Sequence, residues 1–117
     1  KLFAGSEGFR RDFIFVDDIV QMNLHFFQTK GSGIFNAGTG KARSFQDIAT
    51  LLQQLEPAGQ IEIIPFPDHL QGKYQEFTEA DTDLLRKAGY QRPMTSLEDG
   101  VRQYYDLWKR TGGYHRD

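Results

Sequence analysis

The chain has 117 residues, a net charge of -2 and no cysteine. This length corresponds to one domain, or part of one, that can bury a core. The mixed charges argue against a nucleic-acid-binding surface, which needs a clustered basic face. The missing cysteines exclude disulfides and thiolate chemistry, and His25, His69 and His115 lack the spacing of a zinc site, so we expect no bound metal.

No apolar run approaches the length of a membrane span, and no signal peptide is recognisable. We therefore expect a cytoplasmic protein without a membrane partner. Because the sequence begins without methionine, we also expect that an upstream part is missing. Residues 1–117 should form a single unit, with a frayed polar tail at 113–117.

The stretch from Gly8 to Asp18 predicts a buried strand with charged residues at both ends. The run Phe13–Val16 has the aromatic and β-branched composition of a strand buried on both faces. Arg11 and Asp12 precede this run, where side chains become accessible. An arginine at this position suits a phosphate, because the guanidinium is a rigid bidentate donor. The alternative is a local ion pair with Asp12 or another carboxylate.

Alternating apolar patterns predict six further elements and an α/β fold. In chain order they are a helix over 18–29, a buried strand over 33–37, a helix from 44, a strand over 61–66, a short helix capped by Asp81 and ended by Gly89, and a last helix from 96. Ser44 and Asp47 form a predicted capping box. Two prolines make the segment 65–74 irregular, and such segments often carry binding groups.

Two matches to functional motifs are rejected. Gly38-Thr39-Gly40 lies between a predicted strand and a predicted helix, as a dinucleotide fingerprint would, but Arg43 occupies the place of the third glycine. Tyr105 and Lys109 have the spacing of the acid/base pair of short-chain dehydrogenases, but no glycine-rich strand–helix unit lies upstream. We therefore expect no catalytic residue and no cofactor-binding residue in this chain.

Several segments resemble the extended short-chain dehydrogenase/reductase family of sugar-nucleotide epimerases and dehydratases. The segment RDFIFVDD at 11–18 resembles the family signature R-D-F/Y-I/V-x-V-x-D, and FNAGTG at 35–40 followed by SF at 44–45 resembles the next strand–turn–helix. Residues 1–7, 64–81 and 85–90 closely resemble the ADP-heptose 6-epimerase branch. The resemblance extends from Lys1 to about Trp108.

The resemblance implies that this chain is the C-terminal, substrate-binding portion of a Rossmann-type fold. The N-terminal dinucleotide-binding half, which would bind NADP and carry the catalytic tyrosine and lysine, is absent, so the chain alone should be inactive. The implied reaction is inversion of C-6 of ADP-glycero-manno-heptose for the lipopolysaccharide inner core, by a homo-oligomer such as a pentamer. The alternatives are another NAD(P)-dependent sugar-nucleotide epimerase or dehydratase, or a non-catalytic nucleotide-sugar-binding module.

The same resemblance assigns substrate binding to six residues. They are Phe3, Ala4, Gly5, Ser6, Arg11 and Tyr74. Arg11 matches a phosphate-binding arginine and Tyr74 a substrate-contacting tyrosine. Ala4 replaces a larger polar residue of the family, so a contact at this position is assigned to the backbone. The helix from Ile19 and the strand at Phe35 pack on the N-terminal half in the family, so their apolar faces should be exposed here.

Overall fold

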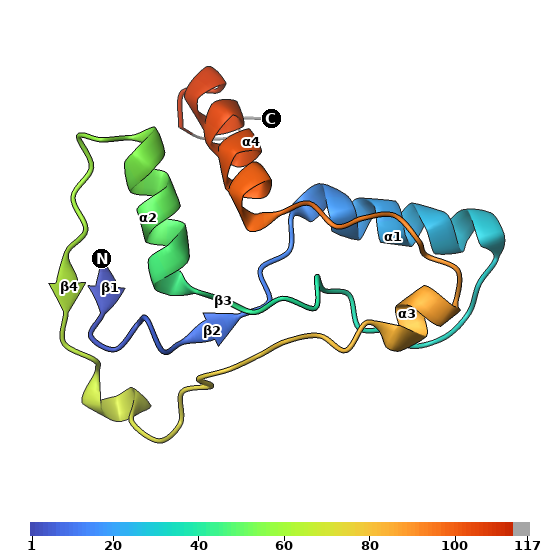
Figure 1. Cartoon of the computed structure of the whole chain (residues 1–117), viewed down its shortest axis with the longest axis horizontal. Coiled ribbons are helices and arrows are strands. Elements are labelled where there is room, and N and C mark those ends of the chain that lie inside the picture. The colour runs from blue at the N-terminus through green and yellow to red at the C-terminus, as the bar shows by residue number, and fades with distance from the viewer. Residues whose placement is uncertain (114–117) are drawn as a thin grey trace.

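The chain forms helices and very short strands in the computed structural model, which describes residues 1–113 (Figure 1). In chain order the elements are β1 (Leu2–Phe3), β2 (Arg10–Arg11), α1 (Val16–Thr29), β3 (Arg43–Ser44), α2 (Phe45–Leu55), β4 (Ile63–Ile64), the 3-10 helix η1 (Asp68–Leu70), α3 (Asp83–Lys87) and α4 (Leu97–Arg110). None of these described helices is long and apolar enough to span a membrane. Apart from Gly113, the expected frayed tail lies outside the described residues.

The strands form two small pairs that connect distant parts of the chain. In the parallel pair of β1 and β4, Leu2 is opposite Ile63. In the antiparallel pair of β2 and β3, Arg10 is opposite Ser44. Arg10 also forms a bridge with Phe77, which brings the segment after η1 alongside β2. These pairings place β4 beside β1, and they place the start of α2 and the segment around Phe77 beside β2.

The starts of two helices follow from their capping residues, as the sequence predicts. The Ser44 side chain accepts a hydrogen bond from the Asp47 amide at 3.0 Å, and the Asp47 carboxylate accepts one from the Ser44 amide at 3.0 Å. This reciprocal pair is the capping box of α2. The Ser96 hydroxyl likewise accepts from the Asp99 amide at 3.1 Å at the start of α4. Both predicted helix starts are confirmed.

The predicted cap of the short helix is one residue too early, because the N-cap is Thr82 instead of Asp81. α3 begins at Asp83, and the Asp81 carboxylate accepts a hydrogen bond from the Asp83 amide at 2.9 Å. Asp81 therefore supports the helix from outside its first turn instead of capping it. Gly89 follows the helix with a φ of 97°, a left-handed conformation that favours glycine.

Three predicted strands are shorter than expected or absent within residues 1–113. Phe13–Phe15 is not a strand, and Val16 already begins α1. Residues 33–37 carry no strand, and the Ile34 side chain is 95% exposed, so the prediction of a buried strand was wrong. The strand over 61–66 is reduced to β4. A β-prone segment becomes a strand only when a neighbouring backbone pairs with it.

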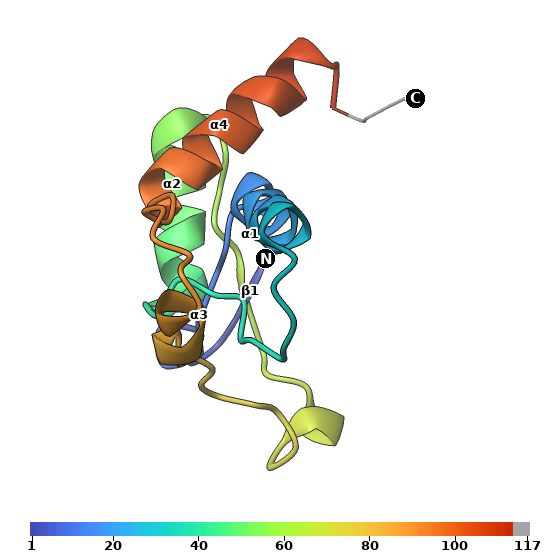
Figure 2. The same cartoon turned by 90° about the vertical axis from the view of Figure 1, so that its right-hand side faces the viewer.

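The apolar core is small for a chain of this length. Its buried centre consists of Met22, Leu85 and Tyr90, between α1 and the region of α3. The radius of gyration is 16.8 Å, whereas a compact chain of this length has about 13 Å. Figures 1 and 2 show the reason: α2 and α4 lie side by side, while α1 and α3 occupy a separate end of an open arrangement.

One face of α1 carries an exposed apolar stripe. Its members are Val16, Val20, Leu24 and Phe27, and the Phe27 side chain is 83% exposed. The spacing of these residues places them on a single side of the helix. Ile34, just beyond the helix, is exposed as well. The exposed apolar face that the family resemblance implied for the helix is therefore present, whereas Phe35 lies in no strand and stacks on Phe26.

Candidate functional site

A pocket of about 340 Å³ is formed by the N-terminal segment, β4, the start of α2 and the segment after η1. Its lining residues are Lys1, Leu2, Phe3, Ser6, Phe9, Phe45, Ile64 and Tyr74. Three of the six predicted substrate-binding residues, Phe3, Ser6 and Tyr74, are among them. Residues from four separate segments of the sequence thus line one hollow.

The turn after β1 is fixed by backbone hydrogen bonds. The Ser6 amide donates to the Phe3 carbonyl at 3.0 Å, and the Ala4 amide donates to the Ile64 carbonyl at 2.8 Å. Gly5 has a φ of 83°, which a residue with a Cβ adopts only with strain. Ala4 and Gly5 are exposed beside the pocket. Because the Ala4 N–H is already engaged in pairing, it is not free to donate to a ligand.

Ser6 provides an unusual polar atom in this pocket. The residue is 3% exposed, and its hydroxyl oxygen has no hydrogen-bond partner among the described residues. Buried polar groups are normally paired, and leaving one unpaired costs about 1–3 kcal/mol. A polar atom of a ligand in the pocket would satisfy this hydroxyl.

Four aromatic rings form a continuous cluster along the pocket. The ring centres of Phe3 and Phe66 are 5.5 Å apart, and those of Phe9 and Phe66 are 5.3 Å apart. Tyr74 completes the cluster at 4.9 Å from Phe9 and 5.5 Å from Phe66. These tilted and edge-on geometries are the favoured ones for aromatic pairs. The cluster therefore holds the Tyr74 ring in place although this residue lies in an irregular segment.

Arg11 lies next to this cluster, and its guanidinium contacts two aromatic rings and two carbonyl oxygens. Its guanidinium carbon, Cζ, is 5.2 Å from the centre of the Tyr74 ring and 5.9 Å from that of Phe45. Its Nη1 donates to the Arg10 carbonyl at 2.8 Å, and its Nη2 donates to the Gln75 carbonyl. Within residues 1–113 Arg11 takes part in no ion pair. The ion pair of Arg11 with Asp12 or another carboxylate, which the sequence left open, is therefore not formed within these residues.

The Asp12 carboxylate instead binds two other segments of the chain. It accepts hydrogen bonds from the Thr39 hydroxyl and from the amides of Thr39 and Gly40, both at 2.8 Å, and of Ala80 at 3.1 Å. Burial acts to raise the pKa of Asp12, but these hydrogen bonds outweigh it and hold the pKa below its usual value. Asp12 is thus a structural carboxylate that joins the 39–40 turn to the segment before α3.

These contacts account for the glycines of the 38–40 turn without requiring that the turn bind a dinucleotide. The amides of Thr39 and Gly40, which a pyrophosphate would need, already donate to Asp12. A Cβ on Gly38 would lie 2.4 Å from the Ala80 Cβ, so the glycine permits close packing of two chain segments. The described geometry of this turn does not fit the phosphates of NADP.

Tyr105 and Lys109 are engaged in a structural network. The Tyr105 hydroxyl donates to the Glu56 carboxylate at 2.6 Å, and the Lys109 ammonium donates to the same oxygen at 2.7 Å. The hydrogen bond to Glu56 raises the pKa of Tyr105 above its usual value. A raised pKa opposes acid/base chemistry near neutral pH. The network ties the end of α2 to α4.

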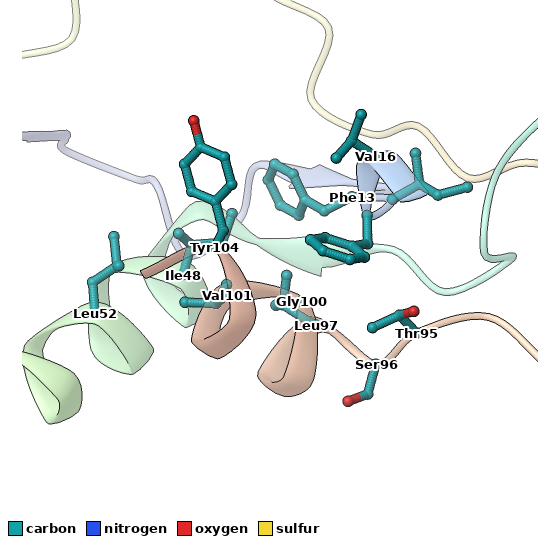
Figure 3. Close-up of a pocket in the computed structure, with 12 residues that line it drawn as sticks. Phe13, Val16, Ile48, Leu52, Thr95, Ser96, Leu97, Gly100, Val101 and Tyr104 are labelled. Carbon is teal, nitrogen blue, oxygen red and sulfur yellow. The ribbon is translucent and has the colours of Figure 1, made fainter. Parts of the chain in front are cut away.

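A second, apolar pocket of about 350 Å³ lies between α2, α4 and the segment at 13–16 (Figure 3). Its lining residues are Phe13, Ile14, Phe15, Val16, Ile48, Leu52, Thr95, Ser96, Leu97, Gly100, Val101 and Tyr104. No charged side chain is among them. This pocket therefore offers nothing to balance the charge of a nucleotide, whereas Arg11 lies beside the first one.

Three aromatic residues of the site were missed by the sequence reasoning. Phe9, Phe45 and Phe66 look like packing residues in the sequence, because their side chains carry no polar group that would mark them as binding residues. Phe9 directly precedes the Arg10–Arg11 pair, and Phe66 lies between two prolines in the irregular segment. These positions next to predicted binding residues were the available signal.

Sequence comparison finds related proteins but no family model that matches the chain. The chain is 49% identical, over 115 residues, to an ADP-L-glycero-D-manno-heptose-6-epimerase of Brachyspira hyodysenteriae. The match covers 97% of this chain but 36% of that relative. The chain thus spans about a third of the length of this relative.

Structural comparison gives consistent results. An ADP-L-glycero-D-manno-heptose-6-epimerase of Helicobacter pylori is similar over 91% of this chain and 32% of its own, with a TM-score of 0.71 and 26% identity. An NAD-dependent NDP-hexosamine 5,6-dehydratase of tunicamycin biosynthesis is similar over 98% of this chain and 36% of its own, with a TM-score of 0.74 and 25% identity. Both are enzymes of sugar nucleotides.

Proposed function

We propose that this chain binds the ADP-sugar in an ADP-glycero-manno-heptose 6-epimerase. The premise is that the chain belongs to the extended short-chain dehydrogenase/reductase family of sugar-nucleotide epimerases and dehydratases. The observation that carries the proposal is the Arg11 guanidinium, which forms no ion pair within residues 1–113 and lies against Tyr74 beside the pocket that contains Ser6. The 49% identity to an ADP-heptose epimerase supports the choice of sugar nucleotide.

Each of the predicted residues has a proposed role. Arg11 binds the pyrophosphate through charge-assisted hydrogen bonds, for which a planar guanidinium is well suited. Tyr74 orients Arg11 and presents its hydroxyl to the ligand, and the buried Ser6 hydroxyl gains its missing partner from the bound nucleotide sugar. Phe3 provides an apolar wall, while the exposed backbone at Ala4 and Gly5 lets the ligand approach closely.

The proposed epimerase needs a nicotinamide cofactor, and we propose NADP. Bound NADP would supply reversible hydride transfer at C-6 of the heptose. The turn at Thr39 and Gly40 does not fit its phosphates, and Tyr105 and Lys109 are engaged by Glu56. NADP and the catalytic tyrosine and lysine are therefore assigned to the part of the enzyme that this chain does not span.

The wider setting follows from the same proposal. The product would supply the inner core of lipopolysaccharide, in the cytoplasm, and the enzyme would be a homo-oligomer such as a pentamer. A different NAD(P)-dependent sugar-nucleotide epimerase or dehydratase is the alternative, favoured by the TM-score of 0.74 to a dehydratase. The aromatic and cationic site would also serve a non-catalytic nucleotide-sugar-binding module.

The test uses the protein translated from the complete reading frame. Calorimetry measures the affinity for ADP-glycero-manno-heptose, ADP, UDP-glucose and GDP-mannose and so gives the preference for the nucleotide and for the sugar. NMR follows inversion at C-6. We expect the ADP-heptose to bind most tightly, ADP to compete with it, and both C-6 epimers to accumulate. Tighter binding of UDP-glucose, or a dehydrated product, would favour the other sugar-nucleotide enzymes. Binding without turnover would favour the non-catalytic module.

A further inference from the structure

We propose that Phe45 is a positioning residue that holds the Arg11 guanidinium in the orientation required for the phosphates of the ADP-sugar. This inference rests on the proposed function above. Phe45 is the first residue of α2, and its ring centre lies 5.9 Å from the Arg11 Cζ. It also lines the pocket together with Ser6 and Tyr74. Phe45 thus contacts the Arg11 guanidinium and also lines the pocket beside it.

An aromatic ring can orient a guanidinium without cancelling its charge. The face of the ring attracts the cation, and the planar guanidinium stacks readily on aromatic surfaces. The other described partners of Arg11 are the Arg10 and Gln75 carbonyls, which are neutral. A carboxylate would hold Arg11 equally well but would compete with a phosphate. The two rings and two carbonyls leave the full charge available to an anion.

The position of Phe45 on a capped helix makes it the more rigid of the two rings. The capping box of Ser44 and Asp47 fixes the helix start, and the Phe45 amide donates to the Phe9 carbonyl at 3.3 Å. Tyr74, in contrast, lies in an irregular segment. Sites supported by regular elements hold their geometry more precisely than sites on loops. Phe45 therefore provides the fixed surface against which Arg11 is oriented.

Phe13 offers a matched control for the packing role of Phe45. The two rings meet edge to face with their centres 5.3 Å apart. Phe13 lines the second, apolar pocket but not the first one. The described rings that the Arg11 guanidinium contacts are those of Phe45 and Tyr74. Truncating Phe13 weakens the packing around Phe45 and leaves the contact with the guanidinium in place.

The experiment is a double-mutant cycle in the protein translated from the complete reading frame. Phe45→Met fills most of the volume but removes the ring, Phe45→Leu is measured in parallel as a second truncation, and Phe45→Tyr keeps the ring. We expect the truncations to weaken ADP-heptose binding and raise KM about five- to tenfold, which lies within the range of a cation–π contact, with kcat nearly unchanged. Phe45→Tyr should bind within about twofold of the wild type. Phe13→Leu should lower Tm without changing the affinity.

Combination with Arg11→Ala gives the decisive comparison. If Phe45 acts through Arg11, adding Phe45→Met to Arg11→Ala weakens binding no further, because the group that it positions is already absent. Additive losses, or a normal affinity in a folded Phe45 truncation with a lowered Tm, would overturn the inference. An Arg11→Ala protein with normal ADP-heptose affinity would instead overturn the proposed function. The two failures are therefore distinguishable.

Discussion

Arg11 and Asp12 are neighbours in the chain, yet their opposite charges serve different partners. The Arg11 guanidinium rests against the rings of Tyr74 and Phe45, whereas the Asp12 carboxylate accepts hydrogen bonds from Thr39, Gly40 and Ala80. One residue is therefore available to a ligand, and the other stabilises the fold. This separation makes the two positions a natural pair for mutation.

Replacing Asp12 should affect stability. Asp12→Asn removes an ionised acceptor from four hydrogen bonds, and hydrogen bonds to charged groups contribute about 1.5–3 kcal/mol each. We expect a lower Tm in the full-length protein and an ADP-heptose affinity close to that of the wild type. Thermal unfolding and calorimetry on the same preparation check this. A loss of affinity at unchanged Tm would mean that Asp12 belongs to the binding site.

The loss of stability at acidic pH should depend on the Asp12 carboxylate as well. The pKa of Asp12 in the folded protein lies below its ordinary value of 3.8. Its contribution to stability is therefore present above about pH 4 and is lost as the pH falls through the lowered pKa. Between pH 5 and pH 3, Tm should fall less in Asp12→Asn than in the wild type. Asp106→Asn, at an exposed position of α4, is the control and should follow the wild-type profile.

The chain alone should have neither epimerase activity nor measurable NADP affinity. The amides of Thr39 and Gly40 are occupied by Asp12, and Tyr105 and Lys109 are occupied by Glu56. Calorimetric titration of the 117-residue chain with NADP should give no saturable heat. Saturable binding at micromolar concentration would contradict this and would make the Gly38–Gly40 turn a cofactor site.

The exposed stripe on α1 should make the isolated chain marginally stable and able to bind a hydrophobic dye. Phe27 is 83% and Ile34 is 95% exposed, and apolar patches of this kind promote association. Dye fluorescence and the unfolding transition are measured on the chain and on a Phe27→Gln/Ile34→Gln variant, which should bind less dye without losing stability. A sharp, reversible melt of a monomer that binds no dye would be inconsistent with the exposed stripe.

The network around Glu56 should be structural. In the full-length protein, Tyr105→Phe removes the hydroxyl that donates to Glu56, and Lys109→Met removes the ammonium that shares the same oxygen. Both changes should lower Tm slightly, because the network joins α2 to α4, and both should leave kcat and KM unchanged. Steady-state kinetics together with thermal unfolding check this, and a large fall in kcat would reinstate this pair as catalytic.

Local signals in the sequence predicted the helices well. The Ser44–Asp47 capping box and the Ser96–Asp99 cap each lie within a few residues, so the pattern alone specifies them. Strand predictions at 13–16 and 33–37 failed because a strand requires a neighbouring backbone, which the described residues do not provide. Sequence patterns report the preference of a segment and cannot report the presence of its partner.

Prediction of the binding site required more than local sequence patterns. Composition and spacing made Arg11 a candidate phosphate ligand but, taken alone, favoured a local ion pair with a carboxylate. Tyr74 and Ser6 were predicted through family resemblance, since nothing local connects them with Arg11. The roles of Phe9 and Phe45 depend on packing between segments that are distant in the sequence, and only the three-dimensional structure brings these rings together.

The central claim is that Arg11 binds the pyrophosphate of the ADP-sugar, and the binding of ADP-heptose to Arg11→Ala in the full-length protein tests it most directly. Loss of charge-assisted hydrogen bonds worth roughly 1.5–3 kcal/mol should weaken binding about tenfold to more than a hundredfold. Arg11→Lys should recover part of this, because an ammonium cannot reproduce the bidentate fork, and NADP affinity should be unchanged in both variants. An Arg11→Ala protein with a lowered Tm that binds ADP-heptose like the wild type would contradict the account.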